Sequence, residues 1–238
     1  MTTPRHRLPD GAWTDPGVFA VNRLPGRSVI RGRAGLDPTD ADEDFRLDLS
    51  GDWRFDWHRG THGLDPMVLG TAGATGADRI SVPGVWQLQG YGTAYYLANT
   101  YPPALGRRAS RIPDIDEDAN ELGVHTREFT LPGDWVDRRT TIVFEGVKAG
   151  LAVFVNETFV GYSQGSFLPA EFDLSAVVRP GRNVVTALVW RYTDGSYLED
   201  QDMWFFSGIF RPVWLNSEPV DGIRDLWVKP TLAPPYLD

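Results

Sequence analysis

The sequence predicts an all-β sandwich, and three observations support this prediction. Short segments that alternate apolar with polar residues recur along most of the 238 residues, separated by Gly, Pro and Asn turn signals. No long amphipathic helix interrupts them. Aromatic residues make up 12% of the chain, with nine Trp, and such side chains suit both sandwich cores and carbohydrate-contacting surfaces.

The first 44 residues do not fit the strand pattern. They are rich in Pro, Gly, Arg and Asp, so we interpret residues 1–44 as an extended arm that lies across a neighbouring surface or is partly disordered. Alternation begins directly afterwards, and residues 45–57 predict two half-buried strands on either side of a Ser-Gly pair.

The next part of the chain predicts few regular elements. A Gly, Ala and Thr stretch at 60–77 predicts a loop, and residues 79–92 begin as a short strand and end in Gly-punctuated turns. Residues 91–120 then form a long connection. A connection of this length in a compact domain is usually functional or part of an interface.

Strand signals resume after this connection, at the spacing of an all-β sandwich. One helical turn is expected from Leu174 to Val178, ended by Pro180 and Gly181. The Asn-Glu-Thr sequence at 156–158 predicts a hairpin turn. The expected strands cover residues 124–131, 140–147, 151–156, 158–163, 183–192 and 210–217.

A last strand signal, at 223–230, lies close to the end of the sequence. We therefore expect a domain boundary near 217–221. On this prediction residues 45–218 form one domain, and residues 219–238 begin a further β-domain.

Composition excludes several classes of function. The net charge of −9 disfavours nucleic acid as a partner, because phosphate binding needs a basic face. No segment has the apolar length of a signal peptide or of a membrane span, so we expect no membrane partner and a cytoplasmic location. The absence of Cys rules out disulfides and thiolate sites, and the four His show no metal-ligand spacing.

Several segments, in their order and spacing, resemble one known family. They are "LSGDWRFDW", "VPGVWQLQGYG", "FEGVKAGLAVFVNETFVGYSQGSFLPAEFDLS" and "YTDGSYLEDQDMWFFSGIFRPVWL". Over roughly residues 13–228 the chain is similar to the N-terminal region of the family 2 glycoside hydrolases, and specifically of the bacterial β-galactosidases. The resemblance implies a jelly-roll sugar-binding domain of the galactose-binding type. It also implies that an immunoglobulin-like domain begins at 219–238.

The resemblance further implies a retaining glycosidase whose two catalytic carboxyl groups, about 5 to 5.5 Å apart, belong to a TIM barrel. No catalytic residue is expected within the 238 residues, and the chain alone is expected to be inactive. The implied partners are a β-galactoside such as lactose, the remainder of its own polypeptide, and further copies in a homo-oligomer. Na⁺ is expected as a cofactor shared with the barrel, and Mg²⁺ only for the full-length enzyme.

An acidic cluster within residues 196–210 is the first candidate site. Glu199, Asp200 and Asp202 stand there among Tyr, Met, Trp and Phe residues. Carboxylates suit hard cations such as Na⁺, Mg²⁺ or Ca²⁺, although the spacing is not that of an EF-hand. The resemblance implies that Asp202, inside "EDQDMW", coordinates Na⁺ and contacts the galactosyl sugar.

Structural roles, not ligand binding, are expected for the other residues around Asp202. Glu199 and Asp200 are expected in a solvated loop, with one carboxylate of the cluster paired to Arg191 or Arg211, because an unpaired carboxylate among aromatic side chains is costly. A hydrolytic pair formed by the cluster itself is the less favoured alternative. Trp204, Phe206 and Ile209 are expected in the core or in a domain contact.

Asn99 is the second candidate. The resemblance implies an Asn that hydrogen-bonds the sugar within a Tyr-Thr-Asn-Val-x-Tyr-Pro pattern, and the corresponding stretch here is "YLANTYPP". Counting back from Tyr101 places Ala98 at the Asn position and Asn99 one residue later. Either the loop shifts by one residue and Asn99 binds the sugar, or the contact is lost or replaced.

Two rival functions remain at this stage. A free-standing carbohydrate-binding module predicts a self-contained sugar surface and measurable affinity for the isolated chain. A structural assembly domain predicts that the arm and residues 91–120 serve subunit contacts.

Overall fold

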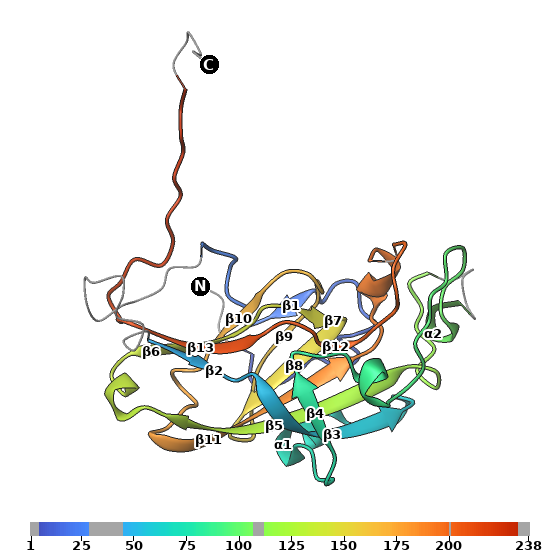
Figure 1. Ribbon diagram of the computed structural model, residues 1–238, viewed down its shortest axis with the longest axis horizontal. Coiled ribbons are helices and arrows are strands. Elements are labelled where there is room, and N and C mark those ends of the chain that lie inside the picture. Colours follow the sequence, from blue (N-terminus) through green and yellow to red (C-terminus); the bar gives the residue numbers. More distant parts are fainter. Residues whose placement is uncertain (1–4, 29–44, 107–111, 200, 233–238) are drawn as a thin grey trace.

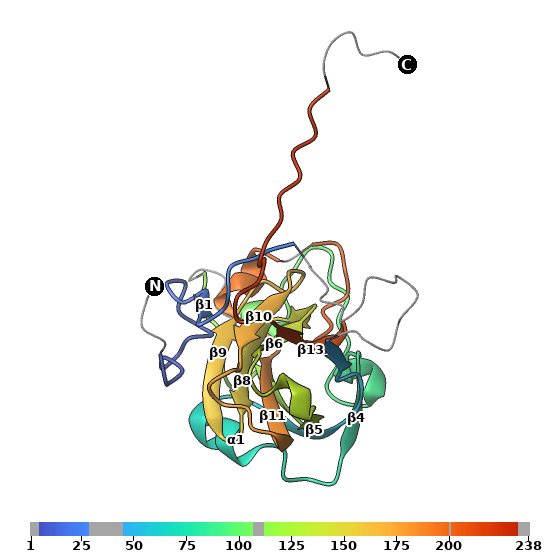
Figure 2. The ribbon, with the colours of Figure 1, turned by 90° about the vertical axis from the view of Figure 1, so that its left-hand side faces the viewer.

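The computed structural model describes residues 5–28, 45–106, 112–199 and 201–232. Within these residues nearly all regular structure is β, and two antiparallel sheets are stacked face to face (Figures 1 and 2). The predicted all-β sandwich is confirmed.

The larger sheet has seven strands, and each strand is antiparallel to its neighbours. Their spatial order is β1 (Ala20–Val21), β9 (Thr158–Ser163), β8 (Gly150–Val155), β11 (Gly181–Trp190), β5 (Glu121–Leu131), β3 (Gly51–Arg59) and β4 (Arg79–Val82).

The smaller sheet has four strands. Their order is β10 (Ala170–Asp173), β6 (Arg139–Phe144), β13 (Val213–Glu218) and β2 (Arg46–Asp48). A further short pair joins β7 (Val147–Lys148) to β12 (Gly208–Ile209). Besides helix α1 (Pro66–Ala72), the described residues form the short helical elements η2 (Trp86–Gln89), α2 (Pro103–Gly106), η4 (Gly133–Trp135) and η5 (Asp194–Tyr197).

Local sequence explains why these strands form where they do. Strand β13 alternates buried and half-buried residues, as a strand with one covered face should. The β8–β9 hairpin turns at Asn156 and Glu157, whose φ values of 49° and 67° are left-handed, as a tight hairpin turn requires. The predicted turn at 174–178 is also present, because the N–H groups of Val177 and Val178 both bond to the carbonyl of Leu174.

The main core lies between the two sheets. Burial of large apolar side chains there is the dominant stabilising term for the sandwich. The core side chains from the larger sheet include Trp53, Phe55, Phe129, Val153 and Val185, and those from the smaller sheet include Ile142, Phe144, Phe172 and Leu215.

The outer face of the larger sheet is covered by a helix that the sequence did not predict. Helix α1 (Pro66–Ala72) lies within the stretch expected to be a loop, so that expectation is wrong. Its N-cap Asp65 accepts hydrogen bonds from the N–H groups of Met67 and Val68. Gly70 lies against Phe154 of β8, where an added Cβ would stand 2.2 Å from the ring.

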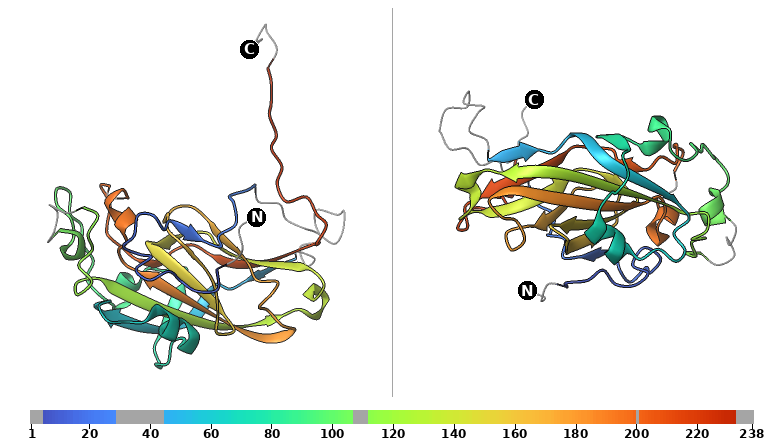
Figure 3. Two further views of the ribbon diagram at one scale, coloured as in Figure 1. Left: turned by 180° about the vertical axis from the view of Figure 1, so that it is seen from behind. Right: turned by 90° about the horizontal axis from the view of Figure 1, so that it is seen from below.

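The first part of the described arm, before β1, covers the same outer face beside α1 (Figure 3), and residues 24–28 continue to β10 of the smaller sheet. The indole of Trp13 stacks on that of Trp190 at a centroid distance of 4.9 Å and an angle of 15°. Leu8, Ala12 and Val21 are buried in the same cluster. The arm residues therefore supply part of the packing for a sheet that is covered on both faces.

The segment after β13 differs from its prediction. The expected strand at 223–230 does not form, because this part of the chain runs away from the sandwich without a neighbouring strand to bond to (Figures 1 and 2). Strand β2 begins at Arg46 and β13 ends at Glu218. The boundaries expected at 44/45 and 218/219 stay predictions.

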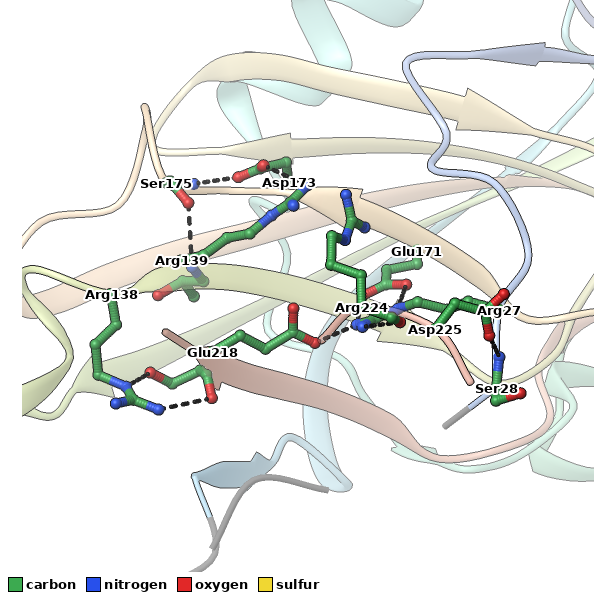
Figure 4. A network of polar contacts seen from close by, with 12 residues as sticks. Arg27, Ser28, Arg138, Arg139, Glu171, Asp173, Ser175, Glu218, Arg224 and Asp225 are labelled. Carbon is green, nitrogen blue, oxygen red and sulfur yellow. Dashed lines mark hydrogen bonds and ion pairs between the residues drawn. The ribbon is translucent and has the colours of Figure 1, made fainter. Parts of the chain in front are cut away.

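Arg27 connects the arm to the start of this outgoing segment (Figure 4). Its guanidinium forms ion pairs with Glu171 of β10, at 2.6 Å, and with Glu218 of β13. It also donates to the carbonyl of Arg224, at 3.1 Å. The neighbouring Ser28 donates its backbone N–H to the Asp225 carboxylate, at 2.9 Å.

Candidate functional site

The acidic cluster divides in the structure. Glu199 is half-buried and accepts hydrogen bonds from the backbone N–H of Ser166, at 2.8 Å, and from the Ser166 hydroxyl. Asp202 lies on an exposed stretch between η5 and β12. Asp200 lies outside the described residues. Glu199 therefore anchors the loop. Of the two acids of the cluster that the structure describes, Asp202 is the one that is exposed.

Asp202 is held by a tyrosine from the long connection. The hydroxyl of Tyr96 donates to the Oδ1 atom of Asp202 at 2.5 Å. This hydrogen bond raises the pKa of the Tyr96 phenol above its usual value near 10. The phenol is protonated at neutral pH even without this shift, so it is the donor of the pair.

The two segments that carry this pair also bond through their backbones. Tyr96 and Trp204 form an isolated antiparallel bridge. The N–H of Phe205 donates to the carbonyl of Tyr95 at 2.9 Å. Residues far apart in the sequence thus form one continuous surface around Asp202.

An aromatic patch borders Asp202, formed by Tyr96, Trp204 and Phe206. The Trp204 and Phe206 rings stack at 5.6 Å and 6°, and the Tyr96 ring lies 5.6 Å from that of Trp204. Tyr96 and Trp204 are each half exposed. Ile209 is fully buried, which confirms its core assignment, whereas Trp204 is half exposed and its alternative assignment, to a domain contact, stays a prediction. A carboxylate beside partly exposed aromatic rings suits a sugar, whose C–H face packs on rings while its hydroxyls bond to the carboxylate.

Asn99 lies in the same connection as Tyr96. Both Asn99 and Ala98 are exposed. The hydrogen bonds of the described residues include none from the Asn99 side chain, and its role as a sugar contact stays a prediction.

A buried ion pair lies beneath the two segments that carry Tyr96 and Asp202. Arg191, 1% exposed, bonds to Glu121 at 2.6 Å, with its Nη1 atom on the Oε1 atom. Its Nη2 atom donates to the carbonyls of Thr93, at 2.6 Å, and Phe205, at 3.0 Å. One guanidinium therefore joins the segment that carries Tyr96 to the segment that carries Asp202.

Neither Glu199 nor Asp202 pairs with Arg191 or Arg211, and for Asp200, outside the described residues, the expected pairing stays a prediction. Arg191 pairs with Glu121, and Arg211 donates to the backbone carbonyls of Glu145 and Phe167. Glu121 lies 70 positions from Arg191 in the sequence, so no local pattern could have indicated this pair. The one available signal was that a buried Arg requires a carboxylate partner.

A cavity of about 500 Å³ opens beside the same ion pair. Glu121 and Arg191 form part of its wall, together with Trp57, Arg59, Tyr95 and Tyr192. Gly92, with φ of 66°, also lines it, and an added Cβ there would stand 2.6 Å from the Glu121 carboxylate. The glycine therefore permits the connection to pass close over the ion pair.

A metal ion needs a set of ligands that surround it. The described residues contain no group of three or more His, Asp or Glu side chains placed to hold an ion. Asp202 offers a carboxylate whose Oδ1 is engaged by Tyr96. That donor chemistry fits one ligand of a hard cation such as Na⁺.

No helix among the described residues combines the length and apolar character needed to cross a membrane.

A protein-family model matches most of the chain. Residues 47–219 match the model described as "Glycosyl hydrolases family 2, sugar binding domain". This range covers the strands of both sheets except β1 and the first residue of β2, and it includes both Tyr96 and Asp202.

Curated relatives extend the similarity. The chain is 42% identical over 190 residues to a β-galactosidase of Psychromonas ingrahamii. It is 35% identical over 243 aligned positions to one of Pseudoalteromonas haloplanktis and 37% over 245 to one of Alteromonas mediterranea, and both alignments span the whole chain. The chain spans only 18% to 23% of the length of these relatives.

Solved structures show the same fold at low identity. A Bifidobacterium dentium β-glucuronidase complexed with coumarin-3-O-glucuronide aligns with a TM-score of 0.52 at 19% identity, over 74% of this chain and 30% of that one. A Faecalibacterium prausnitzii β-glucuronidase aligns with a TM-score of 0.51 at 18% identity, over 83% and 33%. At this identity the likeness concerns the fold alone.

Proposed function

Since the chain belongs to the sugar-binding domains of the family 2 glycosyl hydrolases, we propose that it serves a β-galactosidase by presenting Asp202 to the terminal galactoside. The observation that carries the proposal is the outward-facing Asp202 carboxylate, fixed by Tyr96 and bordered by the aromatic patch. The substrate class is that named for the curated relatives.

The two carboxyl groups of a retaining mechanism are placed outside this chain in our proposal. The relatives are several times longer than the chain, which leaves room for a separate catalytic domain. Asp202 then contributes by orienting the sugar, and positioning of a substrate accelerates reactions by orders of magnitude. The 238 residues alone are expected to be inactive.

Na⁺ is the cofactor that we propose for the site. A bound cation would supply positive charge and orient substrate oxygens, and Asp202 is the residue of this chain that would hold it. Its remaining ligands would come from the rest of the polypeptide, because the described residues supply no further cluster. Mg²⁺ belongs, in this proposal, to the full-length enzyme only.

We extend the proposal to a second sugar contact and to the full-length protein. Asn99 is the second sugar contact, supported by its exposed position on the connection that carries Tyr96. Lactose is a suitable substrate, the full-length protein is a cytoplasmic homo-oligomer, and its immunoglobulin-like and barrel domains complete the site.

Replacement of Asp202 by Asn tests the proposal in the full-length polypeptide. Asn keeps the size of the side chain but removes the charge, so we expect the KM for an aryl β-galactoside and the half-saturating Na⁺ concentration both to rise about tenfold or more, which corresponds to losing one charged contact. Steady-state kinetics over a NaCl series measures both quantities.

Asp137→Asn is the matched control. Asp137 is exposed next to η4, beyond the end of β5 that lies far from Glu121. This variant should behave as the wild type. Unchanged KM and unchanged Na⁺ dependence in Asp202→Asn would refute the proposed role.

A further inference from the structure

The contact between Tyr96 and Asp202 carries an inference about how the site is organised. We propose that Tyr96 is a positioning residue whose hydroxyl holds the Oδ1 atom of Asp202, so that Oδ2 is presented to a cation or to a sugar hydroxyl. The inference rests on the proposed role of Asp202. It adds a residue from the other segment of the site, 106 positions away from Asp202 in the sequence.

Asp202 needs such a contact because it is exposed. An exposed carboxylate samples several rotamers, and ordering it at each binding event would weaken the binding of its ligand. The Tyr96 hydroxyl, 2.5 Å from Oδ1, selects one orientation before the ligand arrives.

Tyr96 is itself held in place. It forms the antiparallel bridge with Trp204, and the centroids of the Tyr96 and Trp204 rings lie 5.6 Å apart. Successive residues of an extended segment point to opposite sides. Accordingly, Tyr95 turns towards Arg191, whose guanidinium lies 5.1 Å from the Tyr95 ring centre, while Tyr96 turns towards Asp202.

The chemical type of the donor also matters. Among the described residues no Lys, Arg or His lies within ion-pair distance of the Asp202 carboxylate. A cationic partner would neutralise the carboxylate and compete with a bound cation. The neutral phenol orients the carboxylate and leaves its negative charge available to the ligand.

Tyr96→Phe in the full-length polypeptide tests the inference, because Phe keeps the ring contact and removes only the hydroxyl. We expect the Na⁺ dissociation constant, measured by calorimetric titration with NaCl in the absence of substrate, to rise about three- to tenfold, as for loss of one hydrogen bond. The KM for an aryl β-galactoside should rise with it, and the melting temperature should stay close to that of the wild type.

Tyr91→Phe is the matched control. Tyr91 donates to the Oδ2 atom of Asp78 at 2.9 Å, so the same hydroxyl is removed from a tyrosine–aspartate pair elsewhere in the domain. Na⁺ affinity and KM should be unchanged in this variant.

The double variant Tyr96→Phe/Asp202→Asn separates the inference from the proposed function. If Tyr96 acts through Asp202, the Tyr96 change has no further effect once Asp202 is replaced. Additive effects, or wild-type Na⁺ affinity in Tyr96→Phe beside a clear loss in Asp202→Asn, would overturn the inference and leave the proposed function standing. If Asp202→Asn alone shows no change, both fail.

Discussion

Arg191 is the residue on which the geometry of the site depends most. It lies beneath the surface, and its bonds to Thr93 and Phe205 hold together the two segments that carry Tyr96 and Asp202. Its charge is balanced by Glu121, which also accepts the indole N–H groups of Trp57 and Trp86, each at 3.3 Å. A surface site is therefore maintained by a buried network.

Replacement of Arg191 by Met should destabilise the protein strongly. The change leaves the buried Glu121 without its cation, and breaking a buried pair in this way costs about 3–5 kcal/mol. Chemical denaturation measures the loss. Arg182→Met is the control, because the Arg182–Glu128 pair is exposed and its loss should change stability little. Equal effects of the two variants would contradict the role given to Arg191.

His125 makes stability depend on pH. It is fully buried against Phe55, at a ring-centroid distance of 4.7 Å, and burial lowers its pKa to about 4. In the unfolded chain the pKa is near 6.5, so the stability contributed by neutral His125 is complete above pH 6.5 and is lost as the pH falls towards 4. The loss amounts to about 3 kcal/mol.

His125→Gln should remove this part of the pH dependence. Unfolding free energies measured between pH 7 and pH 4 should fall less steeply in the variant than in the wild type, since the new side chain does not titrate. His62, which is exposed, provides the comparison, and His62→Gln should retain the wild-type slope. The same slope in all three proteins would contradict the assignment.

At the scale of elements, the arm does more than cover the sheet. Its last described residues, Arg27 and Ser28, bond to β10, to the end of β13 and to the segment that leaves the sandwich (Figure 4). The Arg27, Glu171 and Glu218 side chains are each at most 15% exposed. Arm and outgoing segment should therefore be ordered together.

Arg27→Gln should separate these two segments. The variant leaves Glu171 and Glu218 close together without a cation between them, at a cost of about 2 kcal/mol. Hydrogen exchange at the Ser28 amide, which is bonded to Asp225, should become faster. Arg7→Gln, which removes only an exposed pair with Asp10, should leave this amide protected. Unchanged protection in Arg27→Gln would show that the network does not hold the arm.

The strands were predictable from the sequence because their signal is local. Alternation and turn residues predicted β5, β6, β8, β9 and β11 to within a few residues. Helix α1 was missed because Gly, Ala and Thr dominate its surroundings, although Asp65 followed by Pro66 is a helix-start signal. The helix lies against the sheet through the close approach of Gly70 to Phe154, a contact between distant parts of the chain.

The candidate site was only partly predictable for a similar reason. Asp202 was identified through a resemblance that spans a contiguous motif. Tyr96 and Glu121 act through pairings across 106 and 70 positions, which a single sequence does not contain. The strand expected at 223–230 had the correct composition, but a strand also requires a neighbour, and the described chain provides none there.

At the scale of the whole molecule, the surface around Asp202 and the outgoing segment share one property. Both expose large apolar side chains: Tyr96, Trp204 and Leu198 near the site, and Val220, Ile223, Leu226, Trp227, Val228 and Leu232 after β13. Exposed apolar groups of this kind mark surfaces of interaction. We propose that the rest of the polypeptide covers them and completes the sugar pocket.

A crystal structure of the full-length polypeptide with a bound galactoside and Na⁺ tests the central claim most directly. The account predicts that Oδ2 of Asp202 lies within about 3.2 Å of a sugar hydroxyl, or about 2.4 Å of the cation, while Oδ1 keeps its bond to Tyr96. A galactoside bound in the catalytic pocket with the Asp202 carboxylate facing bulk water would contradict it.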